Sequence, residues 1–139
     1  MFRRVLLAVD ASRNAEKACD EAIALASMTG MEITAISVVD LPDYAATVGE
    51  VEEVKQEGYR LYSKILNNVV KNAERQGVSM TTKILNGHPA ETIIKYAEQG
   101  GYDLIIMGHQ GVSGIKEFLM GSVSAKVLQH AKCSVLVVK

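Results

Sequence analysis

The apolar positions of this chain form two kinds of pattern that alternate along its length. One kind is a short solid run, which predicts a strand buried on both faces, as in a parallel sheet covered by helices. The first two runs stop at Asp10 and Asp40, where polar loops begin. Four such runs are present, at residues 5–9, 33–39, 103–108 and 135–138.

A fifth strand is predicted by a different pattern. Residues 79–85 alternate between two sets of side chains, with Met80, Thr82 and Ile84 on one side. Alternation is typical of a strand with one solvated face. We therefore expect this strand at an edge of the sheet.

The other kind of pattern has helical periodicity. Apolar residues spaced by three and four from Ala15 predict a helix that Ser12 or Asn14 caps and Gly30 ends. A loop at residues 41–50 follows the second strand, and it is either a lid or a loose connection. The next helix, which Gly77 ends and Gly58 interrupts, carries an apolar stripe that we assign to the core. The stripe consists of Val51, Val54, Leu61, Ile65, Val69 and Ala73.

Two shorter helices complete the alternation. Pro89 stands at the first position of one of them, where its missing N–H is not needed, and His88 is the preceding turn or cap residue. The last helix is predicted over residues 122–131. It leads into the final apolar strand.

Five strands that alternate with four helices require right-handed crossover connections. We predict one α/β domain over residues 1–139, a doubly wound five-stranded parallel sheet with the strand order 3-2-1-4-5 and helices on both faces. That order places the carboxyl ends of strands one and four side by side. Asp10 and Gly108 would then face one crevice, which is where such sheets bind ligands.

The final strand, at residues 135–138, lies at the other edge in this order. It is wholly apolar and has no charge or proline to block further pairing. A two-fold axis beside it would pair the strand with its own copy in antiparallel fashion. The sequence therefore predicts a homodimer.

Charge and cysteine content exclude several classes of function. The formal net charge is -1 at pH 7 and the charges are scattered, which disfavours a nucleic-acid partner. Cys19 and Cys133 have no metal or disulfide spacing, so we expect ordinary thiols. The Arg3-Arg4 pair resembles the start of a signal peptide, but the apolar run stops at Asp10. With no run of membrane-spanning length, we expect a cytoplasmic protein without a membrane partner.

The chemistry of the chain is concentrated in the pattern Gly108-x2-Gly111-x9-Gly121-Ser122. Gly108 ends a strand and lets a ligand approach the backbone, and Gly111 permits a turn with positive φ. Gly121 and Ser122 begin the last helix, whose N–H groups and positive dipole end attract an anion. A phosphate group is the expected ligand.

Three residues near this pattern have two possible roles each. Asp10 either accepts hydrogen bonds from ribose hydroxyls or metal-bound water, or it is a turn residue that caps the helix. The Ser122 hydroxyl either caps the last helix or contacts a phosphate or metal-bound water. His109 either contacts a triphosphate or is a spacer with an incidental ring. The residues alone leave these alternatives open.

The glycine pattern, together with strands that end in Ala8-Val9-Asp10 and Val38-Val39-Asp40, resembles the universal stress protein family in its ATP-binding branch. The resemblance covers the whole chain and implies a Rossmann-like fold of the adenine nucleotide alpha hydrolase type. It implies ATP as ligand, or AMP or ADP in its place, together with Mg²⁺. The implied nucleotide contacts are Ala8, Val9, Asp10, Val38, Met107, Gly108, His109, Gly111, Gly121, Ser122, Val123 and Ser124.

Two further points follow from this resemblance. Val38 would line the adenine pocket largely through its backbone, although as an apolar strand residue it also belongs to the core. Many members of the family dimerise through the last strand, and they commonly have proline where this chain has Ser134. That departure changes the start of the strand and leaves the glycine pattern intact.

Three functions remain open at this stage. The favoured one is a nucleotide-dependent regulatory or stress-response module without a catalytic residue. The alternatives are a slow ATPase or phosphotransferase, and a nucleotide-free interaction dimer. The chain has no P-loop and no close Gly-x-Gly-x2-Gly at the first strand. Lys116 is expected to be solvated, and Ser113 has no evident activating partner, so slow or absent turnover is expected.

Overall fold

Nine elements alternate along the chain in a computed structural model that describes residues 2–42, 46–110 and 120–139. The five strands form one sheet in the order β3-β2-β1-β4-β5, and every neighbouring pair is parallel. The predicted fold class and strand order are confirmed. The elements are β1 (Arg4–Ala8), α1 (Arg13–Thr29), β2 (Glu32–Asp40), α2 (Val48–Arg75), β3 (Met80–Gly87), α3 (Pro89–Gln99), β4 (Leu104–Gly108), α4 (Ser122–His130) and β5 (Ser134–Val138).

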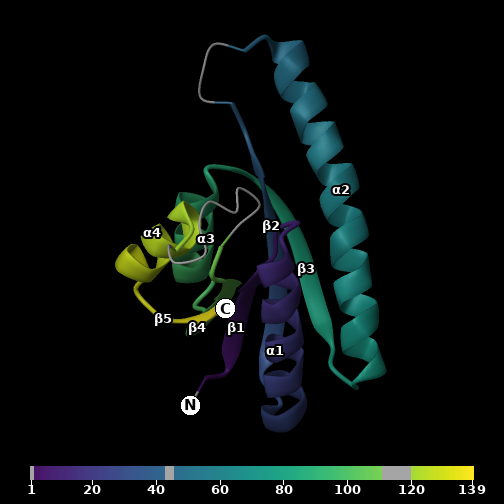
Figure 1. The fold of residues 1–139 in the computed structure, drawn as a ribbon, viewed down its shortest axis with the longest axis vertical. Helices are drawn as coiled ribbons and strands as arrows, with labels where there is room; N and C mark the ends of the chain where they lie inside the picture. Colours follow the sequence, from purple (N-terminus) through teal and green to yellow (C-terminus); the bar gives the residue numbers. More distant parts are fainter. Residues whose placement is uncertain (1, 43–45, 111–119) are drawn as a thin grey trace.

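The helices cover the two faces of the sheet as two layers (Figure 1). On one face, α1 and α2 pack with the strands into one apolar cluster that includes Leu7 and Ile106. On the other face, α3 and α4 form a second cluster that includes Leu6 and Ile105. Successive residues of β1 and β4 thus point to opposite layers, and all four of these side chains are fully buried. This is why the strands read as solid apolar runs.

The two edge strands are β3 and β5, as predicted. Met80 of β3 is buried, whereas Thr82 and Lys83 are exposed. The prediction of an edge strand is confirmed, but a single solvated side is not observed, because residues 81–83 are all exposed and successive strand residues point to opposite sides. The β5 edge remains partly exposed, with Leu136 38% accessible.

Helix α1 begins and ends as its sequence predicts. The Ser12 hydroxyl accepts a hydrogen bond from the Ala15 N–H at 3.1 Å, which identifies Ser12 rather than Asn14 as the cap. At the other end, Gly30 adopts φ 74° and its N–H donates to the carbonyl of Ala26. Glycine takes this left-handed conformation without steric cost.

Helix α2 differs from its prediction in where it starts and in which residues it buries. It begins at Val48 with Thr47 as the cap, so the predicted loop at 41–50 is shorter, and its residues 43–45 lie outside the described chain. The buried residues of α2 are Leu66 and Ala73, whereas Leu61 is 48% exposed.

The reason for this difference is visible in the position of α2. Its first turns extend past the carboxyl ends of the strands, where there is no sheet to pack against (Figure 1). The apolar stripe is therefore core only in the C-terminal half, where Ile65 and Val69 pack against the cluster around α1. Gly58 has a packing role at the end of β2, because an added Cβ would lie 2.6 Å from the methyl groups of Val39.

The two cysteines are free thiols, as expected, and they differ in burial. Cys19 is buried on α1, and burial, followed by the charge of nearby Asp20, raises its pKa from 9.0 to about 12. Cys133 is half-buried, and its pKa is raised chiefly by burial. Both thiols are therefore protonated at neutral pH.

We expect Cys19 to make the stability of the protein depend on alkaline pH. Between about pH 9 and 12 the unfolded thiol is ionised while the folded one keeps its proton, so stability falls as pH rises. The slope attributable to Cys19 is up to about 1.4 kcal/mol per pH unit. Urea unfolding of wild type and Cys19→Ala across this range measures it. The difference between the two should shrink as pH rises, and a constant difference would contradict the assignment.

Candidate functional site

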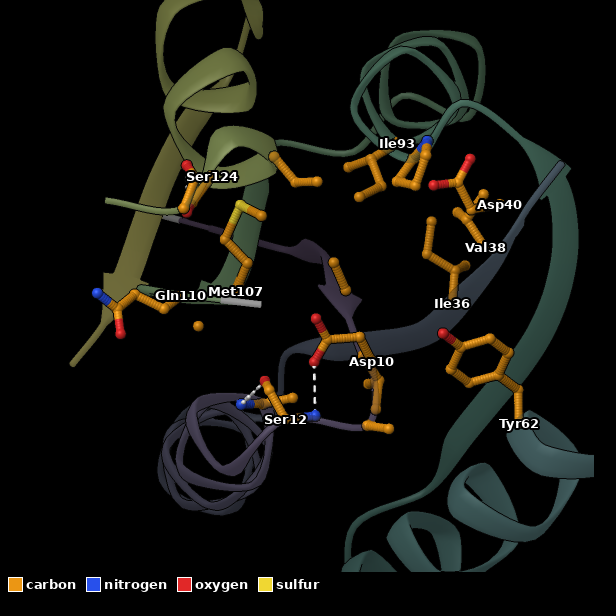
Figure 2. A pocket seen from close by; sticks show the side chains of 18 of the residues that line it. Asp10, Ser12, Ile36, Val38, Asp40, Tyr62, Ile93, Met107, Gln110 and Ser124 are labelled. Atoms are coloured by element: carbon orange, nitrogen blue, oxygen red, sulfur yellow. Dashed lines mark hydrogen bonds between the residues drawn. The ribbon is translucent and has the colours of Figure 1, made fainter. Parts of the chain in front are cut away.

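A cavity of about 450 Å³ opens at the carboxyl ends of β1, β2 and β4 (Figure 2). Its walls come from these strand ends and from α1, α2, α3 and the first turn of α4. The described residues that line it are Ala8, Val9, Asp10, Ala11, Ser12, Ala15, Ile36, Val38, Asp40, Leu61, Tyr62, Pro89, Ile93, Met107, Gly108, Gln110, Gly121, Ser122, Val123 and Ser124. This is the edge of the sheet at which the strand order predicts a ligand.

The structure brings together most of the residues predicted to contact a nucleotide. Those that line the cavity are Ala8, Val9, Asp10, Val38, Met107, Gly108, Gly121, Ser122, Val123 and Ser124. His109 is not among the lining residues. Gly111 lies outside the described residues, as do Ser113 and Lys116 of the spacer.

Asp10 takes part in the turn that starts α1. The Ser12 N–H donates to Asp10 Oδ1 at 2.9 Å, and Figure 2 shows the carboxylate at the edge of the cavity. Asp10 can therefore be both a turn residue and a ligand contact. One carboxylate oxygen accepts the hydrogen bond of the turn, and the residue also lines the cavity. The β1 end is further fixed by Ser37, whose hydroxyl donates to the Val9 carbonyl at 2.8 Å.

The start of α4 presents backbone N–H groups beside the cavity. Its N-cap is Gly121, and no side chain of the described residues makes a capping hydrogen bond to the helix. Of the two roles considered for the Ser122 hydroxyl, capping is not observed, because Ser122 is already inside the first turn. The first bond within the helix runs from the Ala125 N–H to the Gly121 carbonyl. The N–H groups of Ser122, Val123 and Ser124 thus have no acceptor within the helix.

His109 holds α4 against the sheet through its backbone. Its N–H donates to the Val138 carbonyl of β5 at 2.7 Å. Its carbonyl accepts from the Gly121 N–H at 3.0 Å and from the Ser124 hydroxyl at 2.7 Å. The Gly121 N–H and the Ser124 hydroxyl, which belong to two residues expected to contact the nucleotide, are therefore engaged by the protein itself.

Gly108 has a structural reason to be glycine. A Cβ at this position would lie 2.7 Å from the backbone carbon of Asn14 and 2.8 Å from its Cβ. The end of β4 thus packs directly against the first turn of α1, and this contact excludes a side chain whether or not a ligand is bound. Packing against Asn14 therefore explains this glycine as well as the predicted approach of a ligand to the backbone does.

Replacing Gly108 with alanine is expected to destabilise the fold by about 1–3 kcal/mol, because backbone atoms of Asn14 must move to admit the methyl group. It should also weaken any ligand held between β4 and α1. Chemical denaturation measures the first effect. Gly49→Ala, where the nearest atom to an added Cβ is 3.9 Å away, is the matched control. Equal stability of Gly108→Ala and wild type would contradict the packing argument.

One side of the cavity is apolar. Ile36 and Val38 of β2, Ile93 of α3 and Met107 of β4 contribute to it, and all four side chains are buried or nearly so. Figure 2 shows them around the upper part of the cavity, away from Ser12. Such a wall suits the flat faces of an aromatic ring.

Several lining residues were missed by the sequence predictions. Ile36 shares a strand face with Val38, and Asp40 ends the strand beside the one that Asp10 follows, so strand alternation and topology could have found both. Leu61 and Tyr62 come from α2, where the periodicity assigned Leu61 to the core and left Tyr62 out. No local pattern shows that this turn of α2 reaches the cavity.

Two carboxylates and a phenol determine the charge of the cavity at the α2 side. The pKa of the Tyr62 hydroxyl is raised, first by burial and then by the negative charges of Asp10 and Asp40. The phenol is therefore a neutral hydrogen-bond donor at physiological pH. Positive potential comes from the opposite side, at the N-terminus of α4.

Within residues 2–42, 46–110 and 120–139, no three His, Cys, Asp or Glu side chains gather as metal ligands would. Within these ranges, too, no helix has both the length and the apolar character needed to span a membrane.

Comparison with known proteins gives the same picture across the full chain. The sequence profile of the universal stress protein family matches residues 1–139. Universal stress protein YxiE of Bacillus subtilis is 36% identical, with all of both chains aligned. Among solved structures, universal stress protein UspA from Lactobacillus plantarum superposes with a TM-score of 0.93 at 27% identity, covering 99% of this chain and 98% of that one.

A second solved structure is described with a ligand. It is a universal stress protein in complex with cAMP, and it is 25% identical to this chain, with a TM-score of 0.76. The alignment covers 99% of this chain and 97% of that one. The fold, the full-length profile match and the identity to YxiE agree. This chain belongs to the universal stress protein family.

Proposed function

We propose that this protein is an ATP-binding regulatory module that holds the nucleotide in the cavity at the ends of β1, β2 and β4. The observation that carries the proposal is the start of α4, where the N–H groups of Ser122, Val123 and Ser124 lack acceptors within the helix and their residues line the cavity. A helix N-terminus of this kind attracts a phosphate through its N–H groups and its dipole.

The rest of the cavity supports a nucleoside attached to that phosphate. The apolar wall of Ile36, Val38 and Ile93 lies where a purine can exchange water contact for packing. Asp10 borders the space between this wall and α4, where its carboxylate can accept hydrogen bonds from ribose hydroxyls. The volume of about 450 Å³ is within the range of small-molecule sites.

Support for an adenine nucleotide also comes from the relative that was solved in complex with cAMP. Cyclic AMP shares its base and ribose with ATP but has one phosphate. We propose ATP for this chain because the first turn of α4 offers three N–H groups, those of Ser122, Val123 and Ser124, to phosphate oxygens at one side of the cavity. AMP and ADP use the same base and ribose contacts, and they would bind more weakly.

Mg²⁺ is proposed to accompany the phosphates. Mg²⁺ is commonly bound by substrate phosphates, waters and only one or two carboxylates. Asp10 is the carboxylate beside the α1 turn that suits this role, through water. Mg²⁺ would supply positive charge to the triphosphate.

The regulatory role is proposed to involve a homodimer. The partly exposed β5 edge offers unpaired backbone groups and apolar side chains such as Leu136. Because His109 links the end of β5 to α4 through its backbone, pairing at this edge lies close to the cavity. Sedimentation velocity measures the association. A location in the cytoplasm stays a prediction.

The test of the proposed function is thermal unfolding in the presence of ATP, AMP and GTP, each with Mg²⁺. A ligand at a hundred times its Kd stabilises the folded state by about 2.7 kcal/mol, so a saturating rise of Tm with ATP is expected. Phosphate release is measured on the same samples. No shift with any nucleotide would overturn the proposal. Steady release of phosphate by the pure protein would replace it with the slow ATPase.

A further inference from the structure

Tyr62 lies in the cavity although it belongs to none of the elements that carry the glycine pattern. It comes from α2, at the point where this helix passes the carboxyl ends of the strands (Figure 1). Its side chain is half-buried, and it lines the cavity together with its neighbour Leu61. Tyr59, one turn earlier on the helix, does not line the cavity, and its hydroxyl lies 3.5 Å from the Ile84 carbonyl.

The direction of the Tyr62 side chain is significant. Figure 2 shows its ring reaching from α2 toward the cavity, with the hydroxyl end on the side of Ile36 and Asp10. The ring lines the cavity, to which the apolar side chains of Ile36, Val38 and Ile93 also contribute.

We propose that Tyr62 is the residue that recognises the nucleobase in this cavity, with its ring stacked on the base of a purine nucleotide. This inference rests on the proposed function and adds to it a contact from α2. The other side chains expected to contact the base, Ile36, Val38 and Ile93, are aliphatic. They fit the shape of a flat ring but distinguish little between one base and another. A tyrosine ring adds a stacking surface for which purines are better partners than pyrimidines, because their rings are larger.

The hydroxyl of Tyr62 has a defined chemical state in this setting. Because burial and the charges of Asp10 and Asp40 raise its pKa, it remains a donor at neutral pH. A donor beside the base suits an acceptor nitrogen of a purine ring. The ring supplies the main contact and the hydroxyl adds orientation, so removal of the hydroxyl alone should have a small effect.

Four proteins test this inference: wild type, Tyr62→Ala, Tyr62→Phe and Tyr59→Ala. ATP affinity is measured by titration calorimetry, and the fold of each variant is checked by thermal unfolding. Loss of a base-stacking aromatic ring lowers affinity by about tenfold or more, which is the effect expected for Tyr62→Ala. Tyr62→Phe should stay within about threefold of wild type. Tyr59→Ala should bind like wild type.

A nuclear Overhauser measurement separates stacking from a merely structural role. At saturating ATP, the adenine H2 and H8 protons should show contacts to one tyrosine ring, and those contacts to a tyrosine should disappear in Tyr62→Phe while binding is retained. If wild type binds ATP but Tyr62→Ala binds within twofold of it, or if the contacts are missing, the inference fails and the proposed function stands. If wild type does not bind ATP, the proposed function fails and the inference fails with it.

Discussion

Replacing Gly121 with valine is expected to reduce ATP affinity more than a hundredfold while preserving the fold. Gly121 is the N-cap of α4 and lines the cavity, so the added isopropyl group would occupy space at the phosphate end. Each hydrogen bond from the protein to a charged group contributes about 1.5–3 kcal/mol, and losing two of them corresponds to this change in affinity. Titration calorimetry with Mg-ATP measures it.

The backbone of Gly121 makes this experiment interpretable. Its φ of -62° and ψ of 154° lie in the extended region that any residue adopts, so valine introduces no backbone strain. The cost is that of a poorer N-cap, about 1 kcal/mol, which unfolding experiments detect separately. Ala125→Val adds similar volume one turn further along α4, at a position that does not line the cavity. Equal loss of ATP affinity in both variants would contradict a local effect at the phosphate end.

Replacing Ile106 with alanine is expected to lower the free energy of unfolding by about 2–5 kcal/mol. Ile106 is in the middle of β4, the strand between β1 and β5, and its side chain is fully buried under the α1 and α2 layer. A protein of this size is stable by about 5–15 kcal/mol, so the variant loses a large share of that margin. Urea denaturation measures the loss.

Val48→Ala is the matched control for this core substitution. Val48 is 81% exposed at the start of α2, so removing its methyl groups leaves no cavity, and a change within about 0.5 kcal/mol is expected. A small effect of Ile106→Ala, comparable with that of the control, would contradict the assignment of β4 to the centre of the core.

Much of the fold could be predicted because a strand that is buried on both faces appears in the sequence as a run of consecutive apolar residues. The strands β1, β2 and β4 are covered by helices on both sides, so nearly every residue must be apolar. The edge strand β3 is exposed at residues 81–83, and its sequence is accordingly mixed in polarity and not a solid apolar run. Strand order then followed from right-handed crossovers, and it placed Asp10 and Gly108 at one crevice, as the lining of the cavity shows.

For helix α2, the sequence pattern did not predict which residues are buried. Periodicity identifies a face of a helix, but it does not show how far along that face the sheet extends. Val51 and Val54 continue the stripe beyond the end of the sheet, and Leu61 is turned to the cavity rather than to the core. Tyr62 could not be predicted as a lining residue, because its position depends on the packing of α2 and not on its neighbours in sequence.

The glycine pattern illustrates that one residue can satisfy two demands. Gly108 is required by its contact with Asn14, so its presence does not by itself indicate a ligand. Gly121 is different, because its φ is open to other residues and its lack of a side chain leaves the start of α4 accessible from the cavity. Gly121 and the N–H groups that follow it therefore indicate a phosphate site more strongly than Gly108 does.

The most direct test of nucleotide binding in this cavity is a crystal structure of the protein grown with Mg-ATP. Phosphate oxygens are expected within hydrogen-bond distance of the N–H groups of Ser122, Val123 and Ser124. The base is expected against Val38, with the Tyr62 ring on its other face. Crystals grown at saturating ATP in which the cavity contains only water, or in which the nucleotide binds elsewhere, would contradict it.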